Sequence, residues 1–219
     1  MSTGEATATG PQRIGWAIPT PYPVNVTVQP KLEQRNRLTV AFRPILAIPH
    51  AILAGPIYWS SSTGLLTAAA YVMAIISWFT LLFGDRHLPE IRSFCMFYLG
   101  WRTRAVTYMA LFRDEYPPFG EAPYPAAVDV VAPTGARDRL SIALRLVFAL
   151  PHLIVIALLG IGWFATTVIA WFAILITGNY PAGLYAFGIG VLRWAVRLEA
   201  YMLLLVDEFA PFTLHEPAA

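Results

Sequence analysis

The chain contains an internal duplication, and this constrains its fold more than any other feature. Equivalent residues lie 102 positions apart early in each copy and 93 positions apart later, always in the same order. The clearest matches are Tyr22-Pro23-Val24 with Tyr124-Pro125-Ala126, Ala47-Ile48-Pro49-His50 with Ala149-Leu150-Pro151-His152, Trp101–Met109 with Trp194–Met202, and Asp114–Phe119 with Asp207–Phe212. The fall in offset indicates about nine extra residues in the first copy, within Tyr58–Thr67. A tandem duplication predicts two similar units that pack together.

Each copy also contains a long stretch without Lys, Arg, Asp or Glu, at 44–84 and 146–192. The chain is 57% hydrophobic and only 13% charged, whereas soluble domains have roughly 25% charged residues. A transmembrane helix needs roughly 20 apolar residues, so each stretch is expected to form a helical hairpin. In the second copy the arms are expected at Ser141–Leu159 and Trp163–Thr177, with a turn at Gly160-Ile161-Gly162. The sequence therefore predicts a mainly α, polytopic membrane protein with about four transmembrane helices.

The basic residues predict how these hairpins are oriented. All 15 Lys and Arg lie outside the two charge-free stretches, so both termini are expected on the cytoplasmic side of a bacterial inner membrane. Two spans per copy give both copies the same orientation, with a pseudo-twofold axis along the membrane normal. The net charge of +2 does not indicate nucleic acid as a partner. The basic residues are better interpreted as topology determinants and as contacts to anionic lipid headgroups.

Two further elements are expected in each copy. Alternating valines predict short, half-buried strands that pair across the pseudo-twofold axis. They are Val24, Val26 and Val28 in the first copy and Val128 and Val130 in the second. A third helix, at Glu90–Arg113 and Gly183–Val206, is apolar but carries several arginines. The cost of arginine at mid-bilayer is nearly cancelled by the apolar residues, so energy alone does not decide its placement. We expect it to be interfacial or half-buried, because a spanning helix would place the basic residues from Arg113 to Arg145 outside, against the positive-inside rule.

These elements divide the chain into five segments. Residues 1–20 are expected to be a disordered cytoplasmic N-terminus, and 21–119 the first membrane repeat. Residues 120–136 form a linker with the start of the second strand, 137–214 the second membrane repeat, and 215–219 a tail.

The motifs of the second copy resemble a known family. They are Ala149-Leu150-Pro151-His152, Ile169-Ala170-Trp171-Phe172, Thr177-Gly178-Asn179-Tyr180-Pro181, Leu192-Arg193-Trp194 and Leu203–Phe212. This set is similar to the bacterial membrane family catalogued as domain of unknown function 4389, closely over Arg139–Leu214 and with more drift over Tyr22–Phe119. The resemblance implies a membrane location and a shared fold, and it supplies no catalytic residue.

The first candidate site is a pair of histidines, His50 and His152, each following a proline in the first helix of its hairpin. A pseudo-twofold axis would allow them to face one another, and two imidazoles can ligate a haem or a metal. Alternatively, each histidine binds the carbonyl freed by its own proline kink, or a group on a neighbouring helix.

The second candidate site is a repeated pairing of tryptophan with arginine. The pairs are Trp101 with Arg104 and Trp194 with Arg197. The arginines could bind a lipid phosphate, with the indoles in the headgroup layer. Alternatively, they pair with the acidic residues of the signature that closes each copy. Both interpretations stay open at this stage.

The sequence contains no phosphate-binding loop, nucleophile elbow or metal-ligand spacing. We therefore expect a non-catalytic protein without a metal or cofactor. Its expected role is that of an accessory or scaffolding subunit in a larger cytoplasmic-membrane complex, with lipids and either a membrane-protein partner or further copies of itself around it. Binding or transport of a lipid or apolar small molecule is the alternative, and a His-ligated haem protein is a third hypothesis.

Overall fold

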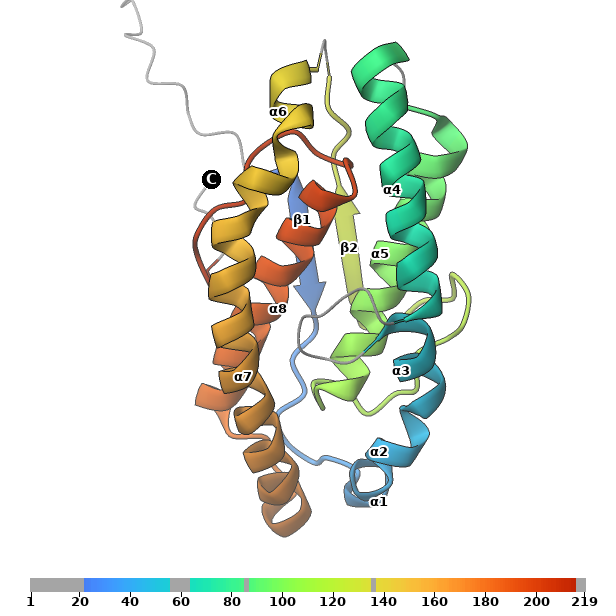
Figure 1. Ribbon diagram of the computed structural model, residues 1–219. Helices are drawn as coiled ribbons and strands as arrows, with labels where there is room; N and C mark the ends of the chain where they lie inside the picture. The colour runs from blue at the N-terminus through green and yellow to red at the C-terminus, as the bar shows by residue number, and fades with distance from the viewer. Residues whose placement is uncertain (1–21, 56–63, 85–86, 135–136, 216–219) are drawn as a thin grey trace, which may run out of the picture.

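The computed structural model describes residues 22–55, 64–84, 87–134 and 137–215, and they form three layers (Figure 1). The elements in chain order are β1 (Val24–Val28), α1 (Arg37–Ala41), α2 (Arg43–Leu46), α3 (Ile48–Ala54), α4 (Leu65–Gly84), α5 (Pro89–Met109), β2 (Ala126–Val130), α6 (Arg139–Ala143), α7 (Arg145–Thr177) and α8 (Ala182–Met202). The middle layer is α5 and α8. On one side α4 packs on α5 and α7 on α8, and on the other side the two strands cover the same helices.

The two strands confirm the prediction made from the alternating valines. β1 and β2 pair antiparallel, and Val26 stands opposite Val128. These two residues are equivalent in the duplication, so the pseudo-twofold axis passes between them. Val24 and Val26 are buried on the middle layer, whereas Asn25 and Asp129 are exposed. The sheet is therefore stabilised by the helices beneath it and presents a polar outer face.

The structure contains one long helix where the sequence analysis predicted the second hairpin. The helix α7 runs unbroken from Arg145 to Thr177, so the predicted turn at Gly160-Ile161-Gly162 was wrong. Glycine disfavours a helix by only about 1 kcal/mol relative to alanine. Here Gly160 is buried, and a Cβ at Gly162 would lie 3.5 Å from the Phe187 ring of α8. Gly162 thus lies within ordinary contact distance of α8, inside one continuous helix.

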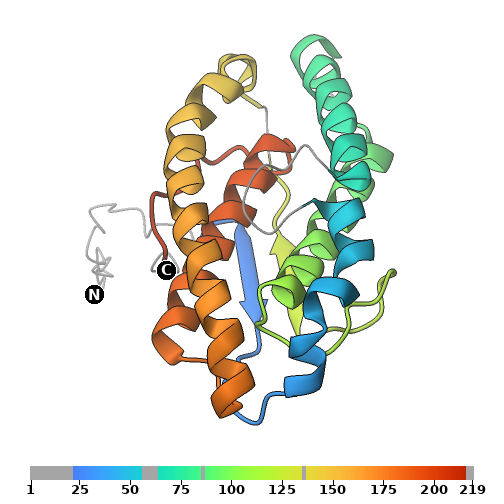
Figure 2. The same cartoon turned by 60° about the horizontal axis from the view of Figure 1, so that its bottom comes forward.

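The first copy builds an equivalent rod from shorter pieces. α2 and α3 correspond to the first part of α7, and α4 corresponds to the rest. Figures 1 and 2 show α3 and α4 following one another along one side of the molecule. Most of the predicted extra residues, 58–63 of Tyr58–Thr67, fall outside the described residues. We call residues 37–84 rod 1 and residues 139–177 rod 2.

The two rods run antiparallel. Trp171 near the end of rod 2 donates through Nε1 to the carbonyl of Val40 in rod 1 at 2.8 Å. The equivalent Trp78 near the end of rod 1 donates to the carbonyl of Ile142 in rod 2 at 2.9 Å. The start of each rod thus lies beside the end of the other. This contradicts the prediction of two upright hairpins pointing the same way, and the pseudo-twofold axis runs perpendicular to the rods.

Two helices, α4 and α7, are long and apolar enough to cross a membrane by length and composition. Four such helices were predicted. Only 28% of the most apolar window of each helix is buried, so most of its apolar surface faces outward. The third helices α5 and α8 begin and end close to the predicted positions, and both are largely buried in the middle layer.

The packing of α8 and α5 predicts that Gly→Ala substitutions at two positions change the free energy of unfolding in opposite directions. A Cβ at Gly188 would lie 2.7 Å from both Phe112 Cζ and Trp163 Nε1, whereas a Cβ at Gly100 on α5 meets nothing within 4 Å. We expect Gly188→Ala to lower the free energy of unfolding by about 1–3 kcal/mol through overpacking. Gly100→Ala should raise it by roughly 0.5–1 kcal/mol. Denaturant titration in detergent measures both, and equal effects would contradict the packing.

Candidate functional site

The two middle helices end in the same unusual way. After α5 the residue Leu111 has a positive φ of 66°, and after α8 Leu204 has a φ of 60°. The amide of Phe112 then donates to the carbonyl of Thr107 at 3.0 Å, and that of Leu205 to Ala200 at 3.0 Å. This closure normally uses glycine, because a left-handed leucine costs roughly 1–2 kcal/mol. Neighbouring groups must therefore hold these helix ends.

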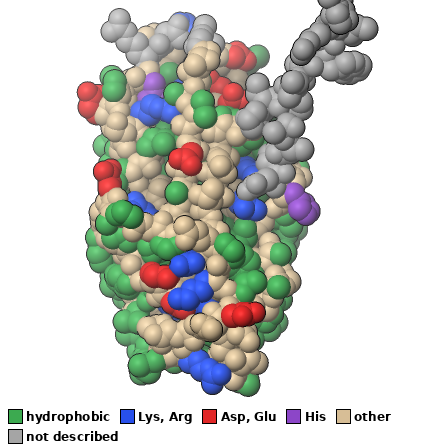
Figure 3. All heavy atoms as spheres, turned by 180° about the vertical axis from the view of Figure 1, so that it is seen from behind, with side chains coloured by type: hydrophobic (Ala, Val, Ile, Leu, Met, Phe, Trp, Pro, Cys, Tyr) green, Lys and Arg blue, Asp and Glu red, His purple; other side chains and the backbone are tan. Residues whose placement is uncertain are grey.

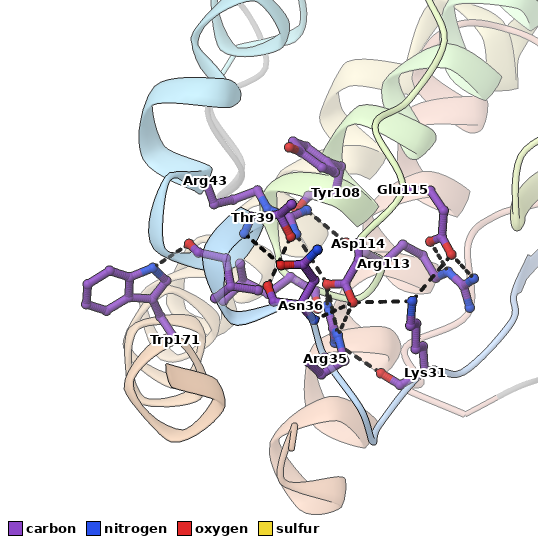
Figure 4. A network of polar contacts seen from close by, with 12 residues as sticks. Lys31, Arg35, Asn36, Thr39, Arg43, Tyr108, Arg113, Asp114, Glu115 and Trp171 are labelled. Carbon is purple, nitrogen blue, oxygen red and sulfur yellow. Dashed lines mark hydrogen bonds and ion pairs between the residues drawn. The ribbon is translucent and has the colours of Figure 1, made fainter. Parts of the chain in front are cut away.

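Two arginines hold the end of α5 (Figure 4). Arg35 donates through Nη2 to the carbonyl of Leu111 at 2.6 Å and to Asp114 Oδ1 at 2.7 Å. Arg43 donates through Nη1 to the carbonyls of Tyr108 and Arg113, at 3.0 and 2.8 Å. Carbonyls at a helix C-terminus have no partner within the helix, and cations there are favourable. Arg35, Arg43 and Asp114 are called cluster 1.

The second copy repeats this arrangement. Arg137 donates to the carbonyl of Leu204 at 3.0 Å and pairs with Asp207. Arg145 donates to the carbonyls of Tyr201 and Val206, at 2.7 and 3.0 Å, and Nη2 lies 3.1 Å from Asp207. These three ionic residues are called cluster 2. The sequence analysis assigned the arginines to topology and missed both clusters. The two arginines repeat at the offset of 102 and the aspartate at the offset of 93. This repetition could have identified both clusters from the sequence.

The electrostatics of cluster 1 favour an ionised carboxylate. Burial on its own raises the pKa of Asp114, but the hydrogen bonds and charge of Arg35 outweigh it, so the pKa lies below its ordinary value. The side chains of Arg35 and Arg43 are 0% and 3% exposed. Two buried cations therefore depend on one carboxylate, and the cluster is a fixed structural element.

An apolar groove lies above each cluster, between the start of one rod and the end of the other. Groove 1 has a volume of about 530 Å³ and is lined by Arg43, Ala47, Ala51, Leu111, Val168 and Phe172, among others. Groove 2 has a volume of about 270 Å³ and is lined by Arg145, Leu146, Leu204, Ile75, Trp78 and Phe79, among others. The two linings are related by the duplication. Each groove therefore has apolar walls and one buried arginine.

The predicted histidines lie in two separate aromatic cages, and not face to face. His50 stacks on Phe119 at 4.7 Å and lies 4.9 Å from Tyr116. His152 stacks on Phe212 at 3.8 Å, and its Nδ1 accepts a hydrogen bond from Trp194 Nε1 at 2.9 Å. The bond from α8 confirms the alternative of a neighbouring helix for His152. No group of three or more metal-ligating side chains occurs among the described residues.

The family model called domain of unknown function, DUF4389, matches residues 37–120 and 139–214. The chain belongs to this family. The search found no matching curated protein and no matching solved structure. Each DUF4389 region contains one rod, one middle helix and the closing signature. The strands, together with Arg35 and Arg137, lie just before the matched regions, so each cluster joins a DUF4389 region to the segment that precedes it.

The predicted tryptophan–arginine pairs are internal to the DUF4389 regions. Arg104 donates to the carbonyls of Gly120 and Ala122, at 2.9 and 3.1 Å, and Arg197 donates to that of His215 at 3.1 Å. The aspartates of the closing signatures bind the cluster arginines. Trp101 and Trp194 are 2% and 5% exposed, so their indoles do not lie in a headgroup layer as one interpretation expected.

One ion pair breaks the symmetry of the two DUF4389 regions. Arg102 of α5 pairs with Glu199 of α8, while the equivalent positions hold Ala195 and Val106. Tyr98 donates to Glu199 at 2.8 Å and lies 2.9 Å from the hydroxyl of Thr67. That hydroxyl donates to the carbonyl of Ala54 at 3.0 Å, where α3 ends. The sequence analysis missed this network, which joins the two repeats at the interruption of rod 1.

The clusters predict the effect of removing each carboxylate. Asp114→Asn leaves two buried arginines without their counter-charge, which should lower the free energy of unfolding by roughly 3–5 kcal/mol. Asp207→Asn should cost less, because the Asp207 side chain is 30% exposed and that of Asp114 only 7%. The control is Asp129→Asn on the exposed face of β2, expected to stay within about 0.5 kcal/mol. Denaturant titration distinguishes the three, and similar losses in all of them would contradict this assignment.

Proposed function

We propose that this chain is a non-catalytic membrane protein, an accessory or scaffolding subunit of an assembly in the bacterial cytoplasmic membrane. One observation carries the proposal: in the described residues, the outer face of both rods is apolar. Exposed large residues there include Ile45, Ile52, Ile75, Phe79, Phe83, Phe148, Ile154, Ile161, Phe172 and Ile176. Figure 3 shows acidic and basic side chains spread over the opposite face. An apolar face of this extent marks a surface for lipid or for a protein partner.

The length of α7 favours a rod that lies along the membrane plane. Its 33 residues make a helix of about 50 Å at 1.5 Å per residue. The hydrocarbon core is only about 30 Å thick. Fitting the helix upright would require a tilt greater than the roughly 40° at the upper end of the observed range. When the helix lies in the membrane plane, its length need not match the thickness of the hydrocarbon core.

The sheet supports the same placement. β1 and β2 lie along the middle layer, so upright rods would put a two-stranded sheet at bilayer depth. Open sheet edges do not occur in contact with hydrocarbon, because their amide and carbonyl groups would be unsatisfied. The exposed polar residues Asn25, Thr27 and Asp129 would also face lipid. With the rods in the plane, the sheet lies in water.

This placement gives both repeats the same orientation towards the membrane. The pseudo-twofold axis passes through the layers and then coincides with the membrane normal. The face that carries the acidic and basic side chains in Figure 3 then faces the cytoplasm under the positive-inside rule, and we place both termini on the same side. The buried charges hold helix ends and join the repeats, which supports a structural role over a catalytic one.

Purification from native membranes tests the accessory role. In mild detergent the chain should retain a stoichiometric protein partner, because the proposed role has a partner cover part of its apolar face. Intact-complex mass spectrometry and an absorption spectrum of the same sample give the result. A solitary chain with a Soret band would instead favour a haem protein, and a solitary chain without one would remove the support for a partner.

Sided labelling tests the orientation. Glu33 lies beside the end of α7, because the neighbouring Leu32 carbonyl accepts from the amide of Tyr180. Thr134 precedes α6 at the other end of the molecule. With the rods in the membrane plane, Glu33→Cys and Thr134→Cys should both react with an impermeant maleimide in inverted membrane vesicles. Neither cysteine should react in spheroplasts. The unsubstituted chain, whose Cys95 is buried, is the control. Reaction of one site from each side would establish a spanning orientation.

A further inference from the structure

The two strands have unlike outer edges, although the duplication makes them equivalent. β1 and β2 form a two-stranded sheet, so each strand has one edge that pairs with the other strand and one outer edge. The amide of Gln29 donates to the carbonyl of Pro125 at 2.9 Å. Because the pairs of an antiparallel ladder alternate between bonded and non-bonded, Val26 and Val128 direct their backbone groups towards the two outer edges.

An arginine binds the outer edge of β1. Arg193 of α8 donates through Nε to the carbonyl of Val26 at 3.4 Å. A charged side chain at an edge strand is one of the features that prevent another strand from pairing there. At the equivalent position α5 has Gly100, which has no side chain to reach the carbonyl of Val128. The outer edge of β2 therefore lacks the side chain that occupies the outer edge of β1.

The missing side chain leaves a hollow along α5, the helix that packs against β2 (Figure 1). A Cβ at Gly100 would meet no atom within 4 Å. Since Arg193 reaches Val26 from the equivalent position, the hollow borders the edge of β2 at Val128. It has a volume of about 410 Å³, and its lining on α5 includes Arg92, Met96, Phe97, Gly100 and Arg104.

An unpaired strand edge selects an extended peptide as its partner. The backbone N–H and C=O groups of such an edge are a template for a further strand. Strand addition uses these groups for affinity and adjacent pockets for side-chain specificity. The half-buried Met96 and Phe97 give the hollow an apolar centre. A side chain of the added strand can enter the hollow at Gly100, because that position has no side chain of its own.

The charges of the hollow favour an acidic segment. Arg92 and Arg104 line its two ends, roughly 18 Å apart at 1.5 Å per residue of helix. Within the described residues both donate to backbone carbonyls and neither forms an ion pair. The lining has one carboxylate, Glu121, against these two guanidinium groups. A strand at about 3.3 Å per residue spans the distance between the arginines with about six residues.

We propose that the outer edge of β2 binds an extended acidic segment of a protein partner as a third strand. Its backbone pairs at Val128, an apolar side chain enters the hollow at Gly100, and acidic residues near its ends lie beside Arg92 and Arg104. A second copy of this chain fits less well, because pairing β2 with β2 places two cationic hollows face to face. The proposal rests on the proposed accessory role and names the partner's contact, which lies on the aqueous side of the rods.

Peptide binding to the full chain in detergent tests the proposal. The probe is a fluorescein-labelled peptide of about seven residues, with a glutamate at each end and alternating valine and threonine between. Fluorescence anisotropy should show saturable binding. A version with lysine in place of glutamate should bind roughly tenfold more weakly, because repulsive contacts replace attractive ones. A version with N-methylated backbone amides should not bind, because it cannot donate to the strand edge.

Two readouts place the peptide on the edge of β2. Gly100→Arg installs the residue that the second copy carries as Arg193, so it fills the hollow and should weaken peptide binding roughly tenfold. Gly100→Ala is the matched control, because it adds one methyl group to open space and should bind as the unsubstituted chain does. In the unsubstituted chain, hydrogen exchange of the Val128 amide should slow when the peptide binds.

Each other result would overturn the proposal in a distinct way. Equal binding of the lysine peptide would exclude recognition of acidic side chains, and binding of the N-methylated peptide would exclude strand pairing. Full binding by Gly100→Arg, or unchanged exchange at Val128, would exclude the edge of β2. Absence of binding would exclude an acidic strand as the occupant. The peptide and exchange comparisons use the unsubstituted chain, so they hold even where Gly100→Arg fails to fold.

Purification from native membranes separates this proposal from the proposed function. A chain that retains a stoichiometric partner there but binds no acidic peptide would contradict the strand edge alone. A chain that binds the peptide at β2 but is solitary in native membranes would contradict the accessory role alone.

Discussion

The structure depends on how the ends of α5 and α8 are held. Each helix ends on a left-handed leucine, and the carbonyls exposed there are bound by two arginines that share one aspartate. Arg35 comes from the segment before rod 1, Arg43 from rod 1 itself, and Asp114 from the segment after α5. One cluster therefore fixes three parts of the chain relative to one another. Without it the rod would lose its position on the middle helix, and the groove above would lose its floor.

The two repeats are alike in these clusters and unlike where they meet. The pseudo-twofold axis passes between Val26 and Val128, and the contacts around it are equivalent in both copies. The Arg102–Glu199 pair has no equivalent, because the matching positions are alanine and valine. It lies beside the end of α3, where rod 1 is interrupted and rod 2 is continuous. A buried ion pair of this kind adds little stability over apolar residues of similar size, but it satisfies a free carbonyl at that interruption.

The sequence predicted local and repeated features well, and long-range geometry less well. Alternating valines identified both strands and their pairing, and the repeated motifs identified the DUF4389 family. The second hairpin was wrong because composition does not distinguish two short apolar helices from one long one, and a Gly-Ile-Gly segment suits a turn as well as a close helix contact. The clusters were missed because Arg43 and Arg145 border apolar stretches, as topology determinants also do. Only the fold shows that they are buried beside helix ends.

The antiparallel rods make each copy depend on the other for its hydrogen bonds. The indole of Trp171 binds the first turn of rod 1, and the indole of Trp78 binds that of rod 2. Each strand likewise has its partner in the other copy. A chain with a single copy would leave these groups exposed, so it would have to associate with a second molecule about a true twofold axis. The duplication supplies this second partner within one molecule, so the contacts that each copy needs do not depend on the concentration of the protein.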